Sequence, residues 1–168
     1  MSTSTVRIIG LDPGSRHTGY GVIDKVGSRL VTVKFGRFSP SPKAELPERL
    51  AALATRLEQL LDDCSPSHAA LETPFQGLNA RSLIVLSQAR GVLLAALAGR
   101  GIAIREYAPT EVKNAVSGYG RADKKQVEGM VRQILSLRQE RIASDAADAL
   151  AVAICCAHRS RLEELAEQ

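Results

Sequence analysis

Four acidic residues lie at positions from which their carboxylates could reach one common site. Asp12 follows the apolar run VRIIGL, and Glu72 ends the short apolar segment HAALE. Both are therefore expected at the C-terminal ends of strands, where open α/β sheets bind their ligands. Asp145 and Asp148 are three residues apart at the start of a helical pattern, which places them on one face, about 5–6 Å apart at Cβ.

Four carboxylates gathered in this way would form an oxygen-rich site that suits magnesium. Mg²⁺ prefers oxygen ligands and keeps several of its waters. Two such ions about 3.5–4 Å apart can activate a water and stabilise the leaving oxygen of a phosphodiester. Without metal the carboxylates repel one another, which disfavours a purely architectural cluster. The sequence therefore predicts a phosphodiester-cleaving centre with two Mg²⁺ ions per subunit, in which Mn²⁺ can substitute.

Each acid alone also has an ordinary structural explanation. Asp12 in Asp-Pro-Gly suits a turn, and Glu72 before Thr-Pro can be a charge at a strand end. Asp145 in a first helical turn favours the helix dipole, while Asp148 can simply face solvent. The prediction of a metal site therefore depends on the four acids together.

The elements expected to position these acids follow the order βββαβαβααα. The first three strands form an antiparallel meander, and the later strands alternate with helices. This order predicts an α/β fold with a five-stranded mixed sheet flanked by helices on both faces, in one domain over residues 1–168. The expected strands are 6–11, 19–26, 30–38, 68–72 and 102–107. The expected helices are 46–61, 79–98, one N-capped by Thr110, one over about 123–136, and one capped by Ser144 that begins at Asp145.

Bulk properties indicate a soluble cytoplasmic protein. The 168 residues are 45% hydrophobic, enough to bury a core without a disulfide or a structural metal. The three cysteines have no C-x-x-C spacing, which favours a reducing compartment. The N-terminus lacks the apolar segment of a signal peptide. The apolar stretch 91–98 is far shorter than the roughly 20 residues that span a bilayer, so no membrane association is expected.

A basic group surrounds the glycine-bearing loop 117–125. Its members are Lys113, Arg121, Lys124 and Lys125. Such a group can neutralise DNA phosphates, and Lys124 can stabilise charge on a reacting phosphate. The alternative is a solvated surface without a partner. The net charge of +4 is compatible with a polyanionic partner but does not require one.

Two apolar features leave alternatives open. Phe75 lies in a loop beside Glu72 and could stack on an unpaired base, or it could anchor the loop in the core. The segment RSLIVLSQARGVLLAALAGR is apolar nearly all round, which is typical of an internal core helix or of a dimer interface. The pattern alone favours a core helix.

Several blocks of the chain together resemble the RuvC family of Holliday junction resolvases. They occur in the family's order and span residues 7 to about 158. They are Asp12-Pro13-Gly14-Ser15-Arg16 with Thr18-Gly19-Tyr20-Gly21, Glu72 with Phe75, Gln88-Ala89-Arg90-Gly91, Val112-Lys113, Gly118-x-Gly120 with Lys124, and Asp145-Ala146-Ala147-Asp148-Ala149-Leu150-Ala151.

The resemblance implies a ribonuclease H-like fold and a homodimer that nicks two opposed strands of a four-way DNA junction symmetrically, in recombination and repair. It implies products with a 5′-phosphate. It also implies cooperation with a branch-migration motor and its junction-binding subunit. The family's residues map onto this chain as metal ligands Asp12, Glu72, Asp145 and Asp148, catalytic lysines Lys113 and Lys124, and the junction-wedging Phe75.

Two departures from the family's pattern bear on the site. The family commonly has Gln-x-Phe after the glutamate, whereas Thr73-Pro74 precedes Phe75 here, which would stiffen the loop. Some members have His at the position of Asp145. The Asp in this chain favours Mg²⁺ or Mn²⁺ through all-oxygen ligation.

Three other functions remain to be weighed. A sugar-kinase or actin-like ATPase shares the D-x-G motif, but it needs two domains, for which 168 residues are too few. A nuclease of the same fold could act on hybrids or flaps, since junction specificity depends on the resemblance. A DNA-binding module without activity would need no acidic cluster, so metal dependence separates it from an enzyme.

Overall fold

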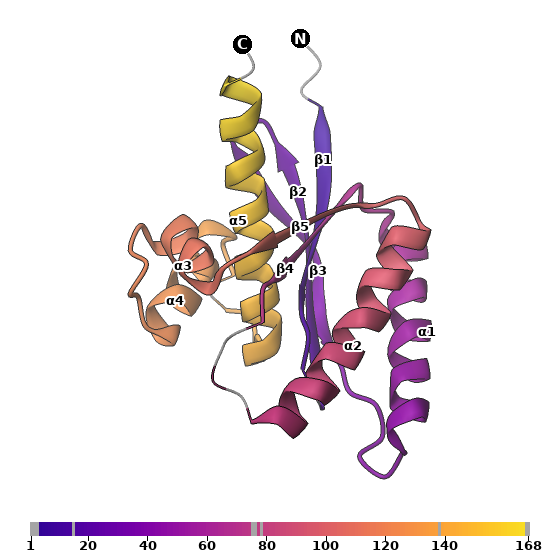
Figure 1. Cartoon of the computed structure of the whole chain (residues 1–168). Coiled ribbons are helices and arrows are strands. Elements are labelled where there is room, and N and C mark those ends of the chain that lie inside the picture. Colours follow the sequence, from indigo (N-terminus) through magenta and orange to yellow (C-terminus); the bar gives the residue numbers. More distant parts are fainter. Residues whose placement is uncertain (1–3, 15, 75–76, 78, 138, 167–168) are drawn as a thin grey trace.

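Five strands form one mixed sheet in the order β3-β2-β1-β4-β5 (Figure 1). The computed structural model describes residues 4–14, 16–74, 77, 79–137 and 139–166. β1, β2 and β3 form an antiparallel meander, and β4 and β5 extend it in parallel with β1. The predicted five-stranded mixed sheet is confirmed, with strands at Thr5–Asp12, Thr18–Val26, Arg29–Phe38, His68–Glu72 and Ala103–Tyr107.

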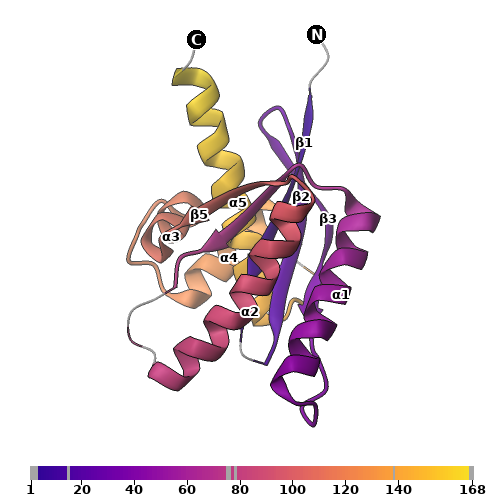
Figure 2. The same cartoon turned by 45° about the vertical axis from the view of Figure 1, so that its right-hand side comes forward.

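Helices cover both faces of the sheet, as predicted (Figures 1 and 2). α1 and α2 pack on one face, and α5 packs on the other with α3 and α4 beside it. The apolar side chains form two core clusters, one in each layer between helices and sheet. The helices are α1 (Leu46–Cys64), α2 (Ala80–Gly99), α3 (Pro109–Ser117), α4 (Lys124–Ile134) and α5 (Ser144–Ala166).

The central strand β1 is buried on both sides from Ile8 to Leu11, which explains the run of residues without polar side chains there. Ile8 packs into the cluster under α5, whereas Ile9 packs into the cluster under α1 and α2. Successive side chains of a strand point to opposite faces, so a strand between two helical layers must be apolar at consecutive positions.

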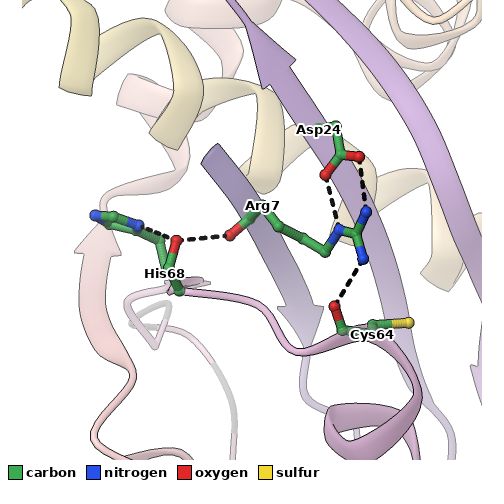
Figure 3. A network of polar contacts seen from close by, with 5 residues as sticks. Arg7, Asp24, Cys64 and His68 are labelled. Atoms are coloured by element: carbon green, nitrogen blue, oxygen red, sulfur yellow. Dashed lines mark hydrogen bonds and ion pairs between the residues drawn. The ribbon is translucent and has the colours of Figure 1, made fainter. Parts of the chain in front are cut away.

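A polar network ties the start of β1 to its neighbours, at the opposite end of the strand from Asp12 (Figure 3). Arg7 donates from Nε and Nη2 to the two carboxylate oxygens of Asp24 on β2, both at 2.8 Å, and from Nη1 to the Cys64 carbonyl at the end of α1. The Ser67 hydroxyl donates to the Arg7 carbonyl and lies 2.9 Å from Nδ1 of His68 on β4. These contacts join β1, β2, α1 and β4.

Two predicted helix starts are wrong. Thr110 is not an N-cap, because α3 already begins at Pro109 and Ala108 occupies the capping position. Proline suits the first helical position since its fixed φ matches the helix and it lacks an N–H. The Glu111 carboxylate accepts the Ala108 backbone N–H at 2.8 Å. Ser144, the other predicted cap, is itself the first residue of α5, and the first helical hydrogen bond runs from the Ala147 N–H to the Ala143 carbonyl.

The prediction that the long apolar helix is a core helix is also wrong for most of its surface. In α2 only Ala89, Arg90, Leu93 and Leu97 are buried, and Ile84 is 59% exposed. Among the described residues α2 is the one helix long and apolar enough to cross a membrane by length and composition, with 22% of that window buried. The helix covers the sheet with one stripe and leaves a second stripe open, on which Leu83 and Ile84 are the exposed large apolar residues.

Candidate active site

The structure brings the four predicted acids to one end of the sheet. Leu11 of β1 pairs with Leu71 of β4, so Asp12 and Glu72 end adjacent parallel strands. Asp145 lies in the first turn of α5 and Asp148 follows it by three residues. In both views α5 begins at the end of the molecule where β1 finishes (Figures 1 and 2).

Two glycines allow the start of α5 to lie directly against the strands. A Cβ on Gly19 of β2 would lie 1.9 Å from the Asp145 carbonyl oxygen. A Cβ on Gly10 of β1 would lie 2.0 Å from the Ala149 carbonyl oxygen. No side chain fits at either contact, so these glycines set how closely the α5 acids approach Asp12.

The four carboxylates influence one another electrostatically. Burial raises the pKa of Asp12 to about 7, and the charges of Asp148, Glu72 and Asp145 add to this shift. Burial, followed by the charge of Asp148, also raises the pKa of Glu72, while Lys113 and Lys124 oppose that rise. The strand-end acids are therefore partly desolvated and repelled by their neighbours, a situation that a cation would relieve.

Two basic side chains accompany the acids of α5. Nζ of Lys124 lies 2.7 Å from Oδ2 of Asp148, and Nη1 of Arg37 lies 3.8 Å from Oδ2 of Asp145. Burial lowers the pKa of Lys124, but the hydrogen bond and charge of Asp148, with the charges of Asp12 and Asp145, raise it overall. The two cations partly neutralise the acidic cluster.

The donors fit a hard divalent cation in type, since all four are carboxylates. As placed, no three Asp, Glu, His or Cys side chains of the described residues converge closely enough to hold one ion. A divalent ion bound by the α5 acids would have to replace Lys124 and Arg37 as their partners. In the described arrangement, the two acids of α5 are therefore paired with side-chain cations.

A cleft of about 170 Å³ opens beside the two strand-end acids. Its lining residues are Asp12, Pro13, Glu72, Thr73, Pro74, Leu86 and Arg90. The cleft lies between the C-terminal ends of β1 and β4 and the helix α2. Open α/β sheets bind ligands in such crevices.

The predicted DNA-contacting residues fall into two groups. Lys113 on α3 and Lys124 at the start of α4 lie near enough to act on Glu72 electrostatically. Arg121 and Lys125 lie exposed on the loop before α4 and on its first turn. Phe75 falls outside the described residues.

Sequence reasoning assigned no role to two arginines near the acids. Arg90, 8% exposed, donates to the Glu72 carbonyl at 2.6 Å and forms an ion pair with Glu106. Its signal in the sequence was a charge in the middle of an apolar helix, which requires a partner where it is buried. Arg37 on β3 gave no such signal, because its neighbour Asp145 is distant in sequence.

The chain matches one known protein family over most of its length. The family model described as crossover junction endodeoxyribonuclease RuvC matches residues 8–156. The protein of that name from Syntrophomonas wolfei is 42% identical over 162 residues, covering 96% of this chain and 94% of its own. The one from Bordetella petrii is 47% identical over 158 residues, covering 94% of this chain and 86% of its own.

Solved structures agree in fold. Thermus thermophilus RuvC in complex with Holliday junction substrate superposes with a TM-score of 0.88 at 31% identity, over 94% of this chain and 96% of that one. The yeast mitochondrial Holliday junction resolvase has a TM-score of 0.69 at 14% identity, over 95% of this chain and 81% of its own. At that identity it supports the fold alone.

Proposed function

Because the chain belongs to the RuvC family of crossover junction endodeoxyribonucleases and is a Holliday junction resolvase, we propose that Asp12, Glu72, Asp145 and Asp148 form its catalytic metal site. In its ribonuclease H-like fold, these acids lie at the carboxyl ends of β1 and β4 and at the start of α5. The observation that carries this proposal is that adjacent strand ends and the start of α5 bring the four carboxylates together, close enough for the other three to raise the pKa of Asp12.

Family membership indicates a nuclease that depends on a divalent metal. We propose Mg²⁺ as this metal, with two ions per subunit and Mn²⁺ as a substitute, because the four donors are carboxylates. When bound, such ions lower the pKa of a water and stabilise charge on the leaving oxygen. Asp12 and Glu72 would hold metal together with Asp148, while Asp145 completes the ligand set or helps to position the attacking water.

The protein's own side chains supply the remaining chemistry. The proposed reaction is in-line attack by water on a phosphodiester, which leaves a 5′-phosphate and a 3′-hydroxyl. Lys124, whose ammonium already lies beside the acids, would stabilise negative charge on the phosphate. Lys113 opposes the rise in the pKa of Glu72 and so helps to keep this carboxylate ionised.

Junction binding would use the surface on the α3 and α4 side of the acids. Arg121 and Lys125 are exposed there and would neutralise phosphates of the DNA arms. Phe75 follows Glu72 and Thr73-Pro74 in the chain, and we assign it the insertion into the unpaired bases at the crossover. Single-domain organisation over residues 1–168 and action in the cytoplasm beside a branch-migration motor and its junction-binding subunit belong to the same proposal.

We propose a homodimer from the two large apolar residues on the open stripe of α2. Leu83 is 38% and Ile84 59% exposed, although both lie on a helix whose sequence is apolar nearly all round. A second copy would bury this stripe in an isologous interface. Two symmetry-related sites would then cut opposed strands of one junction.

The test is cutting of a synthetic mobile four-way junction in Mg²⁺ or EDTA, with a linear duplex alongside. Asp12→Asn removes a proposed ligand, and Glu140→Gln makes the same type of change at an exposed acid of the loop between α4 and α5. Paired nicks that require metal, appear with Glu140→Gln and vanish with Asp12→Asn support the proposal. Cutting by Asp12→Asn at the wild-type rate would overturn the assigned metal site.

A further inference from the structure

Arg90 is a buried charge next to a proposed metal ligand. It lies in the middle of α2 and is 8% exposed. Burying a cation is costly unless a partner and hydrogen bonds compensate it. Its partner is Glu106 on β5, whose carboxylate accepts from Nη2. The ion pair therefore joins α2 to an edge strand of the sheet.

The second branch of the same guanidinium reaches the backbone of Glu72. Nη1 donates to the Glu72 carbonyl oxygen at 2.6 Å. One residue later, the Thr73 N–H donates to the Tyr107 carbonyl at 2.8 Å, where β5 ends. The C-terminal end of β4 is thus held by β5 on one side and by Arg90 on the other.

We propose that Arg90 is a positioning residue that fixes the end of β4 and thereby the direction in which Glu72 enters the metal site. This inference rests on the proposed function, since it takes Glu72 to be a ligand. A planar guanidinium holds two acceptors at a fixed angle. Arg90 uses that geometry to couple the Glu72 carbonyl to Glu106, while its own body lines the cleft.

The electrostatic and the positioning roles of Arg90 predict opposite results. If Arg90 acted only as a charge, its removal would strengthen cation binding, because one positive charge near the acids would be lost. If it positions Glu72, its removal would weaken cation binding, because the ligand would no longer be held for coordination. Loss of an outer partner of a metal ligand typically lowers metal affinity about 10- to 100-fold.

Two variants separate these roles. Arg90→Met removes both the charge and the donors but keeps an unbranched chain, and Arg90→Lys keeps the charge without the fork. Arg100→Met is the matched control, since Arg100 follows the same helix and pairs with Glu58 and Asp62 of α1 instead. The direct readout is Mn²⁺ binding to the full chain without DNA. Electron paramagnetic resonance of the free ion measures this binding.

We expect the Mn²⁺ dissociation constant to rise about 10-fold or more in Arg90→Met and to rise also in Arg90→Lys, with Arg100→Met unchanged. Junction cutting should then need more metal, while the junction dissociation constant in EDTA stays the same. Unchanged or tighter Mn²⁺ binding in folded Arg90→Lys would overturn the inference. Asp12→Asn distinguishes the two proposals: if it binds Mn²⁺ like the wild type, the metal site itself is wrong.

Discussion

At the scale of single residues, the acids combine burial with mutual repulsion. Asp12 is the extreme case, because burial and three neighbouring carboxylates raise its pKa to about 7 from the ordinary 3.8. Without a cation, its ionised form destabilises the folded protein. Lys124 and Arg37 relieve part of this repulsion at Asp148 and Asp145, but among the described residues Asp12 has no ion pair.

The first prediction concerns Asp12→Asn in metal-free buffer. A folded pKa above the unfolded one stabilises the protein below about pH 4, and this stability is lost as the pH rises through 7. The amide cannot ionise, so at pH 8 the free energy of unfolding should be about 2–4 kcal/mol larger for the variant than for wild type. At pH 4 the two should be equal. Urea titrations in EDTA at both values measure this. Lower stability of the variant at pH 8 would contradict it.

The second prediction compares two adjacent lysines. Lys124→Ala removes the ammonium that lies 2.7 Å from Asp148, so the cleavage step should slow about 100-fold. Lys125→Ala removes an exposed charge on the same turn; it should weaken junction binding slightly and leave cleavage of bound junction unchanged. Single-turnover rates at saturating protein and Mg²⁺ separate these effects. Equal rates for both variants would argue against a role of Lys124 in cleavage.

The candidate site could be predicted from sequence to the extent that strand ends and helix starts are visible there. Asp12 and Glu72 follow apolar runs, and Asp145 and Asp148 share a helical face. The counter-cation Arg37 could not be predicted, because its contact with Asp145 depends on how an edge strand packs beside α5.

At the scale of elements, the site depends on how closely α5 approaches β1 and β2. The contact requires glycine on the strands, and it carries Asp145 and Asp148 toward Asp12. The third prediction is that Gly19→Ala forces the helix away, because its Cβ would lie 1.9 Å from the Asp145 carbonyl oxygen. Overpacking of this kind costs about 1–3 kcal/mol, and cutting should fall even at temperatures where the variant stays folded.

Gly129→Ala is the control for this change. Gly129 lies exposed on α4, and its Cβ would meet nothing within 4 Å. Alanine in a helix is favoured over glycine by about 0.5–1 kcal/mol, so this variant should be slightly more stable and fully active. Thermal unfolding and junction cutting measure both variants. Full activity of Gly19→Ala would show that α5 can move without disturbing the acids.

The element order was predictable, whereas the environment of α2 was not. Alternating and continuous apolar runs identify strands and helices from local sequence. An apolar helical stripe, however, has the same sequence pattern whether it packs against the protein's own core or against another chain. Leu93 and Leu97 pack in the core while Ile84 is exposed, although the sequence pattern gives all three equal weight.

At the scale of the whole molecule, the open stripe of α2 and the acidic site have to be considered together. α2 begins at the end of the molecule where β1 finishes and α5 starts (Figure 2). A two-fold axis along α2 would therefore place both acidic sites on the same side of a dimer. Such an arrangement matches the near two-fold symmetry of a four-way junction with two strands to cut.

The fourth prediction tests this arrangement with Ile84→Glu. A charge on the open stripe cannot be buried without a partner, so the variant should be monomeric while its fold and its Mn²⁺ binding stay intact. Val33→Glu makes the same change at an exposed apolar residue on β3 and should remain dimeric.

Light scattering gives the mass, and a cruciform plasmid distinguishes paired from single nicks. A monomer should yield single nicks, because opposed strands are then cut in independent encounters. A dimeric Ile84→Glu variant would show that this stripe of α2 is not the dimer interface. A monomeric variant that still makes paired cuts would show that paired cutting does not need the dimer.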